Sequence, residues 1–138
     1  MIFSMFGSVA TSNDNSINMK DKLSTSAFIV SPKQMELDLK MISYDIWASI
    51  VHVLMLHSQK IITGKTSKNC LKALLEIKKE ADRGKFIIDP EKGAQLTLEA
   101  KLVEKIGNAA FSIHTGRSRN DQIMTTELLY LREKILGL

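Results

Sequence analysis

A run of nine polar or glycine residues, HTGRSRNDQ at positions 114–122, lies between apolar segments with helical periodicity. Its two arginines, Arg117 and Arg119, can each bind a carboxylate or phosphate through paired hydrogen bonds. Asn120 offers both a donor and an acceptor, and the glycine of the run permits a sharp backbone bend. These residue types predict a site for a small polyanion. The alternative is a loop whose arginines pair with nearby carboxylates and whose Asp121 only caps the next helix.

The same nonapeptide resembles the signature of the argininosuccinate lyases, which are members of the fumarase and aspartase superfamily. The match runs through all nine residues without interruption. Glu99-Ala100-Lys101-Leu102 resembles the acidic helix that precedes the signature in that family. Weaker matches to the family's first helical segment are found, in order, at Ser43, Tyr44, Asp45, Ser49, His52, Met55, Leu56, Ile61, Ile62 and Thr63. The resemblance covers residues 41–138.

The resemblance implies a carbon–nitrogen lyase that reversibly splits argininosuccinate into arginine and fumarate, a step of arginine biosynthesis, with no cofactor and no metal. The reaction removes a proton beside a carboxylate and forms a dianionic intermediate. It therefore needs fixed donors on the carboxylate, a base, and an acid at the leaving nitrogen. The signature can supply only the donors. In the family the acid and base lie on later segments, which this sequence lacks, so we expect a truncated or partial N-terminal segment.

The resemblance also implies which residues bind the substrate. Asn120 corresponds to the family's substrate-contacting asparagine. Arg119 and Arg117 are expected to orient the succinyl carboxylates, although a structural ion pair is an equally open role for Arg117. Ser118 and Thr115 are expected to hold the loop through hydrogen bonds. No catalytic residue is assigned within this sequence.

Three residues depart from the family's pattern. Met41 stands where the resemblance implies a serine in contact with substrate, Gln95 stands where it implies a histidine, and Thr126 stands where an aspartate is common. A methionine cannot donate a hydrogen bond, and a glutamine does not titrate near neutrality. These departures support an alternative function, a non-catalytic descendant that serves as an interaction module. His114 could be a base, but a loop histidine that fixes the backbone is the favoured interpretation.

The fold class predicted from the resemblance is all-α, the N-terminal helical domain of a fumarase/aspartase-like protein that ends in the start of a long bundle helix. We expect a divergent, mobile N-terminal arm over residues 1–40, because residues 7–33 are rich in Ser, Thr and Asn. The helical lyase domain with its signature loop is expected over 41–122, and the start of the bundle helix over 123–138. At 138 residues, the chain is long enough for one domain.

Hydrophobic periodicity predicts the helices. A helix over 44–58 should be buried on most sides, because nearly all its residues are apolar, including Ile46, Ile50, Val53, Leu54, Trp47, Val51 and Met55. A second helix, capped by Thr63 or Ser67, should run to Arg83 with Cys70, Leu71, Leu74, Leu75 and Ile77 inward, and Gly84 should stop it. Residues 85–88 should be extended. The pair Asp89-Pro90 should open a third helix that ends at Gly107, with the signature directly after it.

The last predicted helix carries an apolar seam with alternating spacings of four and three, at Met124, Leu128, Leu131, Ile135 and Leu138. Each such side chain left in water forfeits roughly 1.5–3 kcal/mol. The seam therefore predicts a partner, supplied by oligomerisation or by sequence outside this chain. The resemblance implies a homotetramer whose active sites are each shared among three subunits.

Composition restricts the other function classes. The chain is 44% hydrophobic and 25% charged with a net charge of +4, which is typical of a folded protein that favours anionic ligands. The resemblance implies that these ligands are argininosuccinate and anions such as fumarate or succinate. The basic residues are not grouped with aromatics, so we expect no nucleic-acid binding. Cys70 is the only cysteine, which excludes an intrachain disulfide and a cysteine-based metal site. With no membrane segment or leader expected, the predicted location is the cytoplasm.

Overall fold

Helices make up most of residues 30–137, the part of the chain that this computed structural model describes. They are α2 (Pro32–Ser58), α3 (Gly64–Asp82), α4 (Gly93–Ile106), the 3-10 helix η2 (Gly107–His114) and α5 (Arg119–Leu136). No strand occurs among the described residues, so the predicted all-α class is confirmed.

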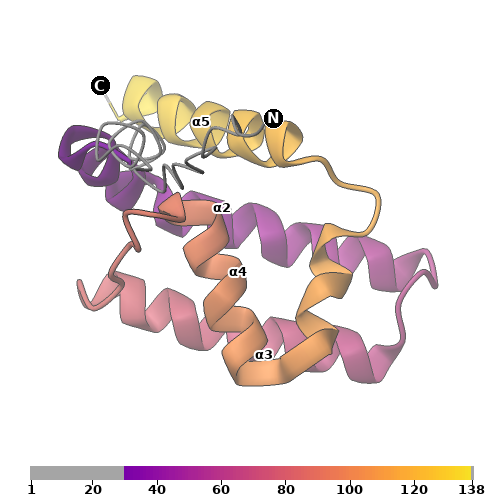
Figure 1. The fold of residues 1–138 in the computed structure, drawn as a ribbon. Coiled ribbons are helices and arrows are strands. Elements are labelled where there is room, and N and C mark those ends of the chain that lie inside the picture. Colours follow the sequence, from indigo (N-terminus) through magenta and orange to yellow (C-terminus); the bar gives the residue numbers. More distant parts are fainter. Residues whose placement is uncertain (1–29, 138) are drawn as a thin grey trace, which may run out of the picture.

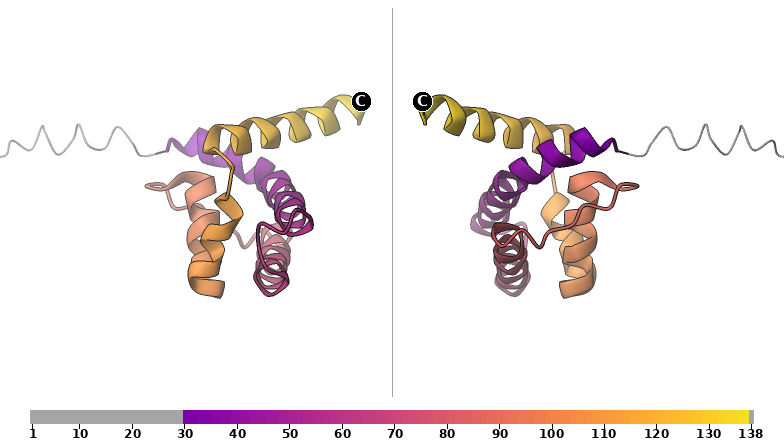
Figure 2. Two further views of the ribbon diagram at one scale, coloured as in Figure 1. Left: turned by 90° about the vertical axis from the view of Figure 1, so that its right-hand side faces the viewer. Right: turned by 90° about the vertical axis from the view of Figure 1, so that its left-hand side faces the viewer.

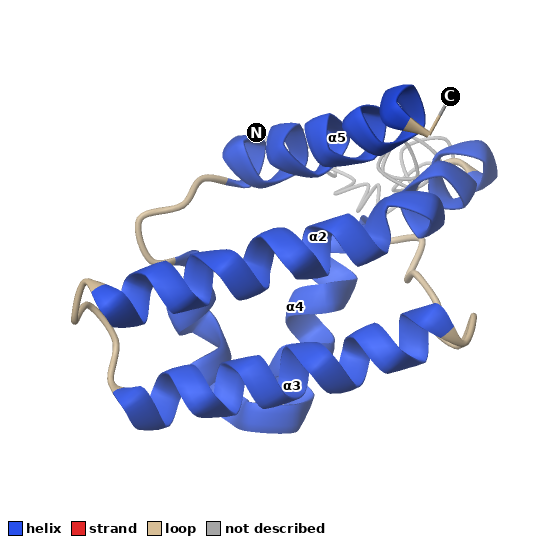
Figure 3. Ribbon diagram, turned by 180° about the vertical axis from the view of Figure 1, so that it is seen from behind, coloured by secondary structure: helices blue, strands red, loops and turns tan. Residues whose placement is uncertain are grey.

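The long helix α2 organises the fold. It packs against α3 along one side and against α5 along the other. Helices α4 and η2 cross one face of the α2–α3 pair, in front of it in Figure 1 and behind it in Figure 3. The backbone of α5 approaches α2 and no other described helix. As a result, the C-terminal part of α5 projects away from the remaining helices (Figure 2).

The core lies where α2, α3, α4 and η2 meet. Aliphatic side chains from all of these elements are removed from water, which is the main favourable contribution to folding. Its largest fully buried side chains include those of Ile46, Val53, Leu74, Ile77, Leu98 and Leu102.

The N-terminal boundary of α2 differs from the predicted one. Ser31 is the N-cap, its hydroxyl accepts a hydrogen bond from the Gln34 N–H at 3.2 Å, and Pro32 occupies the first helical position. Proline suits that position because its missing N–H would have no helical partner. Residues 32–40 therefore belong to the helix and not to an arm. The rest of the expected arm, residues 1–29, lies outside the described residues, as does the last seam residue, Leu138.

The outer face of α2 is more exposed than its composition suggested. Trp47 is 54% exposed and Val51 58%, and Leu54 and Met55 are also exposed. The prediction of a helix buried on most sides is wrong, because α3 and α4 cover one face only and α5 covers part of another. Contrary to the expectation of no such segment, α2 also contains an 18-residue window with a mean hydropathy of 1.4, sufficient by length and composition for a membrane span. Buried residues make up 44% of that window, and because core helices of soluble proteins pass the same test, a single helix of this kind is weak evidence for a span.

The boundaries of α3 follow the sequence signals. Thr63 is the N-cap, and its hydroxyl accepts from the Thr66 N–H at 3.1 Å. The helix ends before Gly84, whose φ of 67° is a left-handed conformation that glycine adopts without strain. Cys70, Leu74 and Ile77 face inward as predicted, and Leu71 is partly buried; Leu75 is exposed, which the pattern did not predict.

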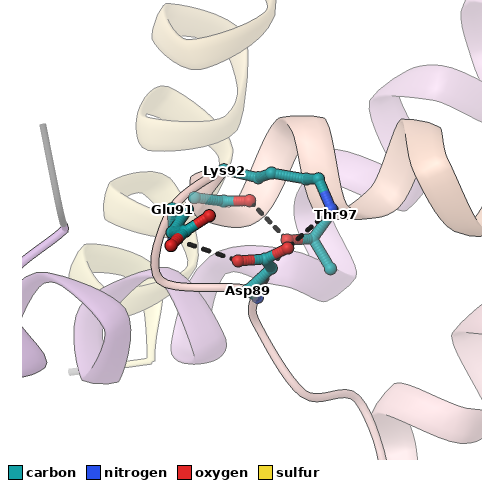
Figure 4. Close-up of polar contacts among 5 residues, drawn as sticks. Asp89, Glu91, Lys92 and Thr97 are labelled. Carbon is teal, nitrogen blue, oxygen red and sulfur yellow. Dashed lines mark hydrogen bonds and ion pairs between the residues drawn. The ribbon is translucent and has the colours of Figure 1, made fainter.

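Helix α4 begins at Gly93 and not at the Asp89-Pro90 pair. The Asp89 carboxylate is engaged in the preceding turn, where it pairs with Lys92 at 2.6 Å (Figure 4). Thr97 closes this turn from inside the helix, since its hydroxyl accepts from the Asp89 N–H at 3.0 Å and donates to the Gly93 carbonyl at 2.7 Å. The polar groups of Asp89 thus stabilise a turn, and the helix starts after that turn, at Gly93. Gly107 ends it as predicted.

Candidate functional site

The signature segment 114–122 is only partly a loop. It begins at the end of η2, an element that the sequence pattern did not predict, turns at Gly116 with a φ of 66°, and enters α5 at Arg119. Ser118 is the N-cap of α5. Its hydroxyl accepts from the Asp121 N–H at 3.1 Å, and the Asp121 carboxylate accepts from the Ser118 N–H at 3.3 Å. This capping box explains why the last four signature residues are helical.

A stripe of three polar residues on α2 faces the signature. Asp45, Ser49 and His52 are separated by four and three residues, which places them on one face of the helix. Asp45 Oδ1 accepts from Gln122 Nε2 at 2.7 Å, Ser49 Oγ accepts from Arg117 Nη1 at 3.1 Å, and His52 Nε2 lies 3.1 Å from the Thr115 carbonyl oxygen. We call these residues the α2 polar stripe. It fixes three successive parts of the signature to one helix.

Asp45 is the charged member of the α2 polar stripe that is buried, with 1% of its surface exposed. Burial raises the pKa of its carboxyl group, and the hydrogen bond from Gln122 and the charges of Arg117 and Arg119 oppose that rise. Burial likewise lowers the pKa of the Arg117 guanidinium from its usual value, while nearby carboxylates counteract it. The charges of Asp45 and the signature arginines therefore offset one another inside the protein.

A second clamp comes from α4. Glu99 Oε2 lies 3.0 Å from Arg119 Nη2 and 3.3 Å from His114 Nε2, so one carboxylate joins the two ends of the turn. This is the pairing with a local carboxylate that the sequence left open as an alternative. Glu99 was not among the predicted site residues. The resemblance at 99–102 was the sequence feature that could have pointed to Glu99. It does not show that the Glu99 side chain faces the signature.

Asn120 differs from its neighbours. It lies in the first turn of α5, it is exposed, and its side chain has no hydrogen bond to any residue of the described chain. Arg119 before it and Gln122 after it are both tied to the interior. The arrangement thus presents the Asn120 amide to solvent on a turn whose flanking residues are fixed.

A pocket of about 260 Å³ opens along the same part of α5. Asn120 precedes Ile123 and Glu127, which line this pocket, by three and seven residues, so the three share one helical face. All three residues that depart from the family pattern also line it. The pocket walls include Gln34, Asp38, Met41, Gln95 and Thr126. The structure thus brings together positions that are far apart in the sequence.

A larger groove of about 510 Å³ runs between α2 and the C-terminal part of α5, lined mainly by apolar groups, among them those of Trp47, Val51 and Leu129. It shares Val51 and Thr125 with a further pocket of about 420 Å³ beside Gly116 and Arg117. Within the described residues, no group of three or more His, Cys, Asp or Glu side chains is placed to hold a metal ion.

Sequence comparison finds relatives of this chain among the argininosuccinate lyases. An argininosuccinate lyase from Chromohalobacter salexigens is 40% identical over 114 residues, which are 80% of this chain and 24% of the relative. One from a Sulfurihydrogenibium species is 38% identical over 112 residues, with the same coverage of 80% and 24%. One from Syntrophus aciditrophicus is 38% identical over 99 residues, 71% of this chain and 21% of the relative. No family model matches the chain.

The helical fold, taken with these relatives, makes the chain an all-α segment related to a class of lyases. Within that class the chain belongs to the argininosuccinate lyase family. It spans about a quarter of the length of the curated relatives that it matches.

Proposed function

We propose that this chain is the substrate-binding N-terminal segment of an enzyme that eliminates arginine from argininosuccinate to give fumarate. The observation that carries the proposal is the exposed Asn120 amide on an otherwise anchored turn. The relatives bear the name argininosuccinate lyase, and the chain covers about a quarter of them. The remaining chemistry then depends on segments that lie outside this chain.

The proposed role of Asn120 is to donate a hydrogen bond to a succinyl carboxylate as negative charge develops there. Donors fixed in advance stabilise such charge without reorganisation during the reaction. The N-terminus of α5 contributes a partial positive charge at the same place. Arg119 and Arg117 add positive charge at the turn, and 38% of the Arg119 side chain is exposed.

The other two proposed substrate-binding residues act by holding the turn. Ser118 supplies the N-cap of α5. The Thr115 N–H donates to the Ser112 carbonyl at 3.2 Å, and its carbonyl lies against His52. In this proposal neither contributes charge. Both keep the Asn120 amide in place.

We further propose that the enzyme is a cytoplasmic homo-oligomer, a tetramer as the family resemblance implies. The seam expected on the last helix is exposed along its described length, with Leu128 59% and Ile135 67% exposed. A row of exposed apolar side chains on a helix suits packing against further helices. Substrate anions such as argininosuccinate and fumarate are the proposed small-molecule partners.

The test is complementation. The full chain is mixed or co-expressed with a family member that lacks its own N-terminal segment, and fumarate release is followed by absorbance. Turnover that depends on Asn120 supports the proposal. Turnover that survives Asn120→Ala unchanged contradicts the role of Asn120, and a stable complex without turnover contradicts the enzymatic proposal.

One observation favours the alternative, a non-catalytic interaction module. The three departures, Met41, Gln95 and Thr126, line one pocket beside Asn120, so any loss of substrate contacts would be concentrated there. If the complex assembles but remains inactive, Met41→Ser and Gln95→His are the first changes to make. Recovery of turnover would show that these positions caused the loss, whereas activity of the unmodified complex would rule out the alternative.

A further inference from the structure

The buried carboxylate of Asp45 has a geometry that packing alone does not explain. It lies in the middle of α2, 1% exposed, where an aliphatic residue would fill the same interior space. A buried carboxylate loses hydration and must be compensated by hydrogen bonds or opposite charge. One oxygen, Oδ1, accepts from Gln122 Nε2 at 2.7 Å. The other has no partner among the described residues.

The partner of Asp45 belongs to the same helical turn as Asn120. Gln122 is 2% exposed and lies two residues after Asn120 in α5. Its side chain reaches inward to α2, whereas the Asn120 side chain is exposed. A fixed Gln122 therefore fixes the rotation of the first turn of α5 about its own axis, and this rotation sets the direction of the Asn120 amide.

The surroundings of Asp45 contain unused capacity for polar contacts. Besides Asp45 Oδ2, the buried atoms without a hydrogen-bond partner in the described chain are Arg119 Nη1 and Gln122 Oε1. All of these atoms belong to residues of the same polar cluster, and Arg119 Nη2 already pairs with Glu99. Two of the three residues that carry such atoms, Arg119 and Gln122, lie in the same helical turn as Asn120. In a core with only a structural role, these unpaired polar atoms would destabilise the fold, and no interaction would compensate for them.

We propose that Asp45 is a positioning residue, which orients the Asn120 amide by holding Gln122 through the hydrogen bond between α2 and the first turn of α5. Asp45 does not touch substrate, since it is almost fully buried. This inference rests on the proposed function, because it assigns to Asp45 the orientation of a residue that binds the substrate.

Two substitutions separate positioning from packing. Asp45→Leu fills the site but removes the acceptor and leaves the buried Gln122 amide unpaired, so it should lower the melting temperature. Measured well below that temperature, where the variant stays folded, kcat of the complemented enzyme should still be about tenfold or more lower through misplacement of Asn120. Asp45→Asn keeps an oxygen that can accept from Gln122 Nε2 and should retain most of kcat. A structural role predicts instead that activity follows stability in both variants.

Ile77→Val serves as the control. Ile77 is fully buried in α3, a helix whose backbone does not approach α5, so the variant should lower stability without changing the α2–α5 hydrogen bond. Its kcat should equal that of the unmodified protein. Wild-type kcat in Asp45→Leu, or an equal loss of kcat in Asp45→Leu and Asp45→Asn, would overturn the inference. If Asn120→Ala leaves turnover unchanged, the proposed function itself fails.

Amide hydrogen exchange in the isolated full chain decides the matter if Asp45→Leu does not assemble with the complementing segment. Exchange at residues 119–122 should be faster in Asp45→Leu than in the unmodified chain, with exchange in α3 unchanged. Equal exchange at 119–122 in the two proteins would overturn the inference without any activity measurement.

Discussion

The two halves of α5 are stabilised in opposite ways. In the first half, Gln122 and Thr126 are each 2% exposed, and hydrogen bonds and ion pairs join the helix to α2 and α4. In the second half, Leu128, Leu131 and Ile135 are at least half exposed and form an apolar row. Polar contacts are directional and fix the orientation of a helix. Burial of apolar surface is not directional, so any complementary apolar surface stabilises it. The first half is therefore complete within this chain, and the second half is suited to a partner.

The largest expected effect concerns the first half of α5. In the complemented enzyme, Asn120→Ala should lower turnover about 10²- to 10³-fold, the usual cost of removing one fixed donor from a developing charge. The circular dichroism spectrum should not change, because Asn120 is exposed and has no hydrogen bond within the described chain. A change of less than about threefold would be too small for a donor of this kind.

The next effect concerns the second half. Leu131→Asp should abolish association, because it places a charge in an apolar interface where each side chain contributes about 1.5–3 kcal/mol. Leu75→Asp is the matched control, since Leu75 is 49% exposed on α3 compared with 50% for Leu131. Sedimentation velocity should show smaller particles for the first variant alone. Equal behaviour of the two variants would mean that the apolar row of α5 is not the interface.

A smaller effect distinguishes the N-cap of α5 from that of α3. Ser118→Ala and Thr63→Ala each remove a side-chain acceptor at a helix start, so each should lower the free energy of unfolding by about 1 kcal/mol in urea denaturation. Only Ser118→Ala should accelerate amide exchange at residues 119–122. If both variants do so, the first turn of α5 is held by global stability and not by its own cap.

The smallest effect is a pH dependence. Burial raises the pKa of Asp45 above its usual 3.8, so the protonated carboxyl favours the folded state. This contribution is fully present below the unfolded pKa and is lost as the pH rises through the folded pKa. Compared with the unmodified chain, Asp45→Asn should therefore show a smaller decrease in melting temperature as the pH rises from about 3.8. If the melting temperatures of the two proteins changed with pH in the same way, the raised pKa of Asp45 would be contradicted.

The sequence predicted elements whose signals are local. Thr63 and Gly84 bound α3 because a cap and a left-handed glycine act within a few residues. The start of α4 was mispredicted for the opposite reason, since Thr97 and Lys92 take the groups of Asp89 into a turn that the dipeptide signal does not contain. The exposure of Trp47 was also missed, because an apolar residue on an apolar helix carries no mark of the face that remains uncovered.

The candidate site shows the same division. The sequence by itself determined the all-α class, the family resemblance, and the polar segment in which a substrate-binding residue had to be sought, because these depend on residue types and short spacings. Only the tertiary structure decided that the α2 polar stripe and Glu99 would hold the arginines and Gln122 of that segment while Asn120 remained exposed. The physical reason is that hydrogen bonds and ion pairs between α2, α4 and α5 depend on how the helices are packed and rotated, which no single segment encodes.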